Sequence, residues 1–287
     1  MKFDNDFREM KIRHIVVMFL IIMFFTIVAV IITLLRNGDL SNTDTNILSL
    51  FIESSLVFMI AYKLRLSKKN VKNLCEDFRE NLNVKEMILI ILFITCIKIG
   101  SNNILIDLAY MINPDFANWF VSESETGISS MTDYWIVFIM SVFLAPFTEE
   151  IIFRSTLFKR LSKKFNVYIG LIVSSIIFSS INFGPQMVGI FLFGILNCML
   201  YVKYENILMP MFIYFIDGII SMILVILLNQ FGNQTIVLTL KDMILYAVSG
   251  VGLFAIGMVF FVKFIKENKV YLREMYDKKN TLELNQI

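Results

Sequence analysis

The sequence predicts an all-α membrane protein with about eight transmembrane helices, and three observations lead to this fold class. Hydrophobic residues make up 57% of the 287 residues and charged residues only 17%, against roughly 25% charged residues in an average soluble domain. Mean hydropathy is +0.72. Apolar runs of about 20 residues, which is enough to cross a bilayer, recur along the chain. A soluble globule, a disordered chain and a disulfide scaffold are therefore excluded.

Eight segments are apolar enough to span the membrane, some of them with polar interruptions. They are 14–35, 45–64, 86–111, 134–158, 166–182, 185–203, 206–229 and 242–265. Residues 66–84 carry apolar side chains at helical spacing, which predicts a short amphipathic helix that lies either on the cytoplasmic membrane face or against the protein. We expect one transmembrane domain over 1–266 and a loose, polar cytoplasmic tail over 267–287.

The distribution of basic residues predicts the orientation of these spans. Of the 26 Lys and Arg residues, Lys98 and Arg154 fall inside spans and only Arg36 and Lys241 fall in links on one side. The others lie in the N-terminus, the alternate links and the tail. By the positive-inside rule, both termini face the cytoplasm. We expect a multi-pass protein of the cell membrane, in the plasma membrane of a bacterium, whose first partner is the lipid bilayer.

The fourth span carries three ionisable residues, Glu149, Glu150 and Arg154. Adjacent glutamates point about 100° apart on a helix, and Arg154 is placed one turn after Glu150, within reach of an ion pair. Glu149 has no charge partner nearby in sequence, which suits a general base or a metal ligand. Pro146 should disturb the helix one turn upstream. The alternative is that the cluster only locks helices together.

Two further polar residues reach a similar depth in other spans. At 1.5 Å per residue, Asn182 and Asp217 lie near the midplane of a hydrocarbon core about 30 Å thick. We therefore expect Glu149, Glu150, Asn182 and Asp217 to surround one polar cavity. The alternatives are a helix cap for Asn182 and an interhelical hydrogen bond for Asp217. Glu53 is expected near a span end, in reach of water.

The segment from about 135 to 225 resembles the CAAX-protease and bacteriocin-processing (CPBP, or Abi) family of intramembrane proteases. The resemblance rests on Ala145-Pro-x-x-Glu-Glu-x-x-x-Arg154, on Phe178-x-x-x-Asn182, and on Asp217 at the end of the third motif. It implies peptide-bond hydrolysis by a water molecule that Glu and His residues activate on a metal. Glu149 would match the water-activating glutamate, with Glu150 beside it and Arg154 as a structural partner.

The chain departs from the family at both motif histidines. Asn182 stands at one of these positions, and the other falls on Ile213, or on Tyr214 if one residue is missing. Asn and Ile cannot shuttle a proton near neutral pH as imidazole does. Zinc is not expected without histidine ligands, although oxygen ligands suit a harder divalent cation. The single histidine, His14, borders the first span.

Three functions stay open on these grounds. The first is a degenerate family member that acts as scaffold, immunity protein or regulator of a membrane-anchored peptide or a cell-envelope protein. The second is an active endopeptidase, of CAAX type or processing bacteriocin precursors, that uses Glu149 and Glu150 with Asn182 and Asp217. The third is a transporter. The sequence leaves open whether the chain is an enzyme and which cofactor it takes, and nothing in it indicates nucleic-acid binding.

Overall fold

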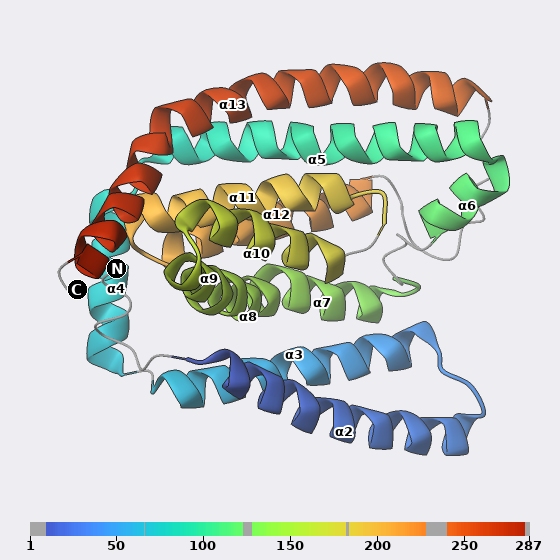
Figure 1. Cartoon of the computed structure of the whole chain (residues 1–287). Coiled ribbons are helices and arrows are strands. Elements are labelled where there is room, and N and C mark those ends of the chain that lie inside the picture. Colours follow the sequence, from blue (N-terminus) through green and yellow to red (C-terminus); the bar gives the residue numbers. More distant parts are fainter. Residues whose placement is uncertain (1–9, 66, 123–127, 182–183, 228–239, 285–287) are drawn as a thin grey trace. The chain divides into compact units, whose positions relative to one another are not determined.

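The computed structural model describes residues 10–65, 67–122, 128–181, 184–227 and 240–284. Within these ranges every regular element is a helix (Figure 1). Seven stretches of the described chain are long and apolar enough to cross a membrane. The predicted fold class, a polytopic helical membrane protein, is confirmed, whereas the orientation with both termini inside stays a prediction.

The candidate spans agree with seven of the eight predicted segments. They are α2 (Ile12–Asn37), α3 (Asn42–Leu64), α5 (Val84–Ile112), the stretch Met131–Lys164, α11 (Met187–Tyr204), α12 (Leu208–Leu227) and most of α13 (Leu240–Leu284). The predicted segment 166–182 forms α10 (Val167–Ile181), which has only 15 residues. At 1.5 Å per residue α10 is about 22 Å long, which is shorter than a hydrocarbon core of about 30 Å.

The described chain divides into two compact units, and the first contains α2, α3, α4 (Lys68–Asn81), α12 and the first part of the fourth span. α2 and α3 pack side by side (Figure 1). The helix predicted within 66–84 is present as α4, and it contacts the beginning of α12. The rings of Phe78 and Phe212 lie 5.6 Å apart, and the Asn206 side chain donates a hydrogen bond to the Leu74 carbonyl at 3.1 Å. These contacts favour packing against the protein.

The second unit contains α5, α6 (Pro114–Ser122), α9 (Lys159–Lys164), α10, α11 and α13. α5 and α13 run along each other (Figure 1) because glycine lets their backbones approach: a Cβ on Gly100 would lie 2.8 Å from Phe254 Cα. α13 continues to Leu284, so most of the tail predicted to be loose is helical, with Leu272 buried on it. The single domain over 1–266 stays a prediction.

The fourth span contains two π-helical segments. It consists of α7 (Met131–Ile139), the π-helix η1 (Met140–Leu144), α8 (Ala145–Glu150), the π-helix η2 (Ile151–Phe158) and α9. The Ala145 N–H bonds to the carbonyl of Met140, five residues earlier, directly before Pro146. Proline has no N–H to donate and crowds the preceding turn, so the predicted disturbance near Pro146 is confirmed. The two π-helical turns enclose the short helix that carries both glutamates.

Candidate functional site

The two adjacent glutamates at the end of α8 have different partners. Glu150 and Arg154 are both fully buried, with 0% and 1% of their side chains exposed, and Arg154 Nε lies 3.2 Å from Glu150 Oε2. The ion pair predicted from their spacing is therefore present. Two opposite charges removed from water are kept only in a close, well-oriented pair, so this pair fixes the end of α8 and the first turn of η2.

Glu149 receives a hydrogen bond from a different helix. The hydroxyl group of Tyr214, on α12, donates to Glu149 Oε2 at 2.9 Å. The histidine of the third family motif could correspond to Ile213 or to Tyr214 in this chain. Of these two residues, Tyr214 is the one that contacts Glu149. Ile213 is completely buried. The glutamate that has no charge partner nearby in sequence is thus held by a phenol from another span.

A third carboxylate belongs to the same neighbourhood. Thr148, directly before Glu149, donates its hydroxyl hydrogen to Glu53 Oε2 at 3.0 Å. Glu53 is half-buried near the middle of α3, so the prediction that it lies near a span end and reaches water was wrong. The depth estimate used for Asp217 would have found it, because α3 extends as far before Glu53 as after it.

Asp217 completes the cluster from α12. Only 6% of it is exposed, and it lies three residues after Tyr214, on the same side of the helix. Electrostatic interactions connect Tyr214 with Asp217 and Glu150, and Glu149 with Glu53 and Arg154. The structure thus brings together four of the five predicted site residues, Glu149, Glu150, Arg154 and Asp217, and adds Glu53 and Tyr214. Asn182 lies outside the described residues, so its place at the cavity stays a prediction.

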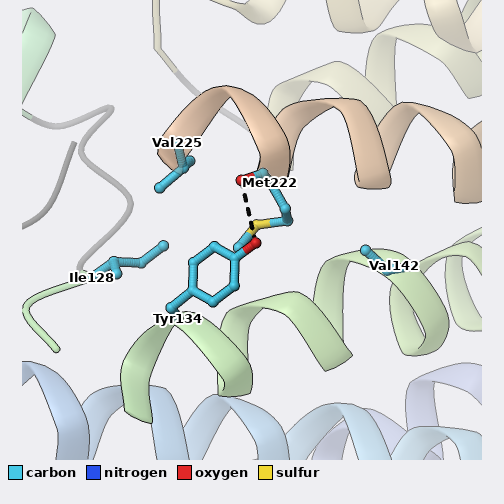
Figure 2. Close-up of a cluster of buried hydrophobic side chains, with 5 residues drawn as sticks. All are labelled: Ile128, Tyr134, Val142, Met222 and Val225. Carbon is cyan, nitrogen blue, oxygen red and sulfur yellow. Dashed lines mark hydrogen bonds between the residues drawn. The ribbon is translucent and has the colours of Figure 1, made fainter. Parts of the chain in front are cut away.

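Packing between α12 and the fourth span holds Tyr214 and Asp217 in place. Figure 2 shows the buried cluster of Ile128, Tyr134, Val142, Met222 and Val225, in which the Tyr134 hydroxyl donates to the Met222 carbonyl at 3.4 Å. One turn before Met222, Gly218 approaches η1 closely: a Cβ there would lie 2.8 Å from the Ser141 carbonyl oxygen. A side chain at 218 would push α12, and with it Asp217, away from the glutamates.

Among the residues that the structure describes, the donor set around Glu149 does not fit a metal centre. Glu149 Oε2 accepts the Tyr214 hydrogen, and Glu150 is committed to Arg154. Within the described ranges, no group of three or more His, Cys, Asp or Glu side chains could hold a metal ion. His14, the single histidine of the chain, lies in the first turn of α2, where its Nδ1 accepts a hydrogen bond from the Lys11 N–H at 3.2 Å. Typical zinc sites in proteins include His or Cys among their ligands, and the residues of this cluster include neither.

Comparison with known protein families gave a match to part of the chain. Residues 131–220 match the family model described as Type II CAAX prenyl endopeptidase Rce1-like. No curated protein and no solved structure matched the chain. The matched segment begins with α7, ends within α12 and includes Glu149, Glu150, Arg154, Tyr214 and Asp217. The resemblance predicted from the motifs is therefore confirmed over residues 131–220, which are similar to the Rce1-like CAAX protease family.

Proposed function

We propose that this chain is a non-catalytic member of its family that keeps the intramembrane polar cluster as a structural and binding centre. The observation that carries the proposal is the hydrogen bond from Tyr214 to Glu149. At one of the two positions to which the motif histidine could correspond, this chain presents a phenol, which keeps its proton near neutral pH and donates a hydrogen bond to the carboxylate. An imidazole exchanges its proton in that range, so the histidine-dependent activation of water is not available to these residues.

The second support is the state of the other carboxylates. Glu150 is neutralised by Arg154, and Glu53 accepts the Thr148 hydroxyl hydrogen. Each acidic group beside Glu149 on α8 or α3 is thus engaged in a contact that joins elements of the first unit. Contacts between polar groups are strong in a low-dielectric interior, so they fix one arrangement of the helices that carry them. In this proposal, the cluster shapes a cavity that receives a membrane-anchored peptide or a cell-envelope protein, and the chain acts as scaffold, immunity protein or regulator in the plasma membrane of a bacterium.

One observation favours the alternative, an active endopeptidase. Two π-helical segments, η1 and η2, enclose Glu149 and Glu150, and π-turns inside helices are frequent at functional sites. In this alternative Glu149 activates the water, and Asn182 and Asp217 orient the substrate or stabilise the oxyanion.

A cleavage experiment separates the two functions. Detergent-purified protein would be incubated with a prenylated CAAX peptide and with a bacteriocin precursor peptide, as wild type and as Glu149→Gln. Glu76→Gln is the matched control. Glu76 pairs with Lys72 on α4, and 58% of its side chain is exposed. We expect no cleavage by any of the three proteins, all of them folded. Cleavage by wild type and Glu76→Gln that disappears in Glu149→Gln would overturn the proposal and support the endopeptidase.

A further inference from the structure

Two adjoining hollows lie between α2 and α3, apart from the glutamate cluster. The first has a volume of about 500 Å³ and is lined by Val17, Met18 and Tyr62, with Arg13, His14 and Lys63 at one end. The second has a volume of about 450 Å³, and its lining includes Ile22, Phe25, Phe51 and Ser55. Both volumes fall within the range of about 300–1,000 Å³ that is typical of small-molecule sites.

The two hollows form one groove, because Phe58 and Met59 line both of them. Along α2 the groove extends from Arg13 to Phe25, which corresponds to about 18 Å at 1.5 Å per residue. One leaflet is half of a hydrocarbon core of about 30 Å, so the groove is about as long as one leaflet is deep. The small side chains of Ser54 and Ser55 on α3 leave the space that a larger side chain would fill.

The charges in this groove gather at one end. Arg13, His14 and Lys63 line only the first hollow, and neither hollow has an acidic lining residue. In the part of the chain that the structure describes, no ion pair involves Arg13 or Lys63. The remaining walls are apolar or carry the hydroxyl groups of Tyr62 and two serines. The groove therefore offers an apolar channel for a hydrocarbon chain and two cations for an anionic group at its mouth.

We propose that the groove between α2 and α3 binds one anionic phospholipid, with an acyl chain along Val17–Phe25 and the headgroup phosphate at Arg13 and Lys63. Basic pockets between transmembrane helices bind anionic headgroups on the cytoplasmic side, which is the side that the charge distribution predicts for this end of α2. The headgroup of a zwitterionic lipid also carries a positive charge, so its attraction to Arg13 and Lys63 is weaker. The site does not depend on the chemistry of Glu149.

The test is lipid retention by the full chain, measured by native mass spectrometry after incubation with phosphatidylglycerol or phosphatidylcholine of identical acyl chains. We expect retention of one phosphatidylglycerol molecule, in preference to phosphatidylcholine by a factor on the order of tenfold. The double substitution Arg13→Gln with Lys63→Gln should remove this preference. Arg36→Gln, at the opposite end of α2, is the matched control and should keep it.

A second variant tests the apolar part of the groove. Ser55→Leu fills the space between the helices, so it should lower retention of phosphatidylglycerol while the thermal unfolding midpoint stays near that of wild type. Equal retention of both lipids, or a preference that survives the double substitution, would overturn the proposal. So would a dimer of the chain that Ser55→Leu dissociates, because the groove would then hold a second copy.

Discussion

The contact between Tyr214 and Glu149 joins two spans through a single hydroxyl group. Replacement Tyr214→Phe removes the donor and leaves the Glu149 carboxylate without this hydrogen bond in a half-buried place. We expect a loss of about 1–3 kcal/mol in the free energy of unfolding, measured by thermal unfolding in detergent. Tyr62→Phe, at a tyrosine that is 80% exposed, should change little. A double-mutant cycle with Glu149→Gln that shows no coupling would contradict a direct interaction.

Glu150 and Arg154 form the second contact that can be tested one residue at a time. Arg154→Met leaves a fully buried carboxylate without its cation, and loss of one partner of a buried pair costs about 3–5 kcal/mol. The double substitution with Glu150→Gln should recover most of this loss. The exposed pair of Lys72 and Glu76, 3.6 Å apart, provides the control, because Lys72→Met should cost about 0–1 kcal/mol. Equal losses at Arg154 and Lys72 would contradict the structural role of the buried pair.

Local spacing predicted the residues whose partner lies one turn away and missed those whose partner lies in another span. The pair of Glu150 with Arg154 follows from helical geometry alone. The motif spacing indicates Tyr214 only as one of two positions for an absent histidine, and the span bounds place Glu53 near a span end. Both contact α8 from other helices, and a single sequence contains no signal for such tertiary contacts.

At the scale of elements, the distance between α12 and η1 decides whether Asp217 and Tyr214 face the glutamates. Gly218→Ala would place a Cβ 2.8 Å from the Ser141 carbonyl oxygen, so we expect a destabilised protein although alanine is the better helix former. Gly252→Ala, on α13, meets no atom within 4 Å and should be neutral or stabilising. Unfolding midpoints of both variants, compared with wild type, give the answer. A Gly218→Ala protein as stable as Gly252→Ala would show that the helices are less closely packed.

Periodicity and length predicted the position of nearly every helix, but not how each helix is wound. The disturbance near Pro146 followed from the missing N–H of proline, whereas the second π-helix, Ile151–Phe158, contains no residue that predicts it. Within it, the Thr156 hydroxyl donates to the carbonyl of Ile151, five residues earlier, at 3.1 Å. The continuation of α13 beyond residue 266 was missed because charge and polarity were read as a tail, although Leu272 is buried.

At the scale of the whole molecule, the number of crossings determines on which side the C-terminus lies. The predicted orientation, with both termini on the cytoplasmic side, needs an even number of crossings, so it requires α10 to cross together with the seven longer helices. Without it, the basic residues of the tail would face outward, against the positive-inside rule. Cys75 on α4 is exposed and Cys198 is buried, which allows a direct test of the first half of this topology.

A membrane-impermeant maleimide should label Cys75 in inside-out vesicles and leave it unlabelled in intact cells, because α4 is predicted to face the cytoplasm. Cys75→Ser should abolish the label. A tag after Ile287 should be protected from protease in intact cells, because the tail is also predicted to face the cytoplasm. Labelling of Cys75 from outside would show that the orientation is opposite to the predicted one. A tag that is cut from outside, with Cys75 inside, would indicate seven crossings.

The central claim is that Tyr214 and the ion pair of Glu150 with Arg154 leave no metal-dependent hydrolytic centre at Glu149. The measurement that tests it most directly is the metal content of detergent-purified protein after incubation with zinc or manganese, for wild type beside Glu149→Gln and Tyr214→Phe. The account predicts substoichiometric metal that does not differ among the three proteins. Stoichiometric metal in the wild type that is lost in Glu149→Gln would contradict it and restore the case for an active intramembrane protease.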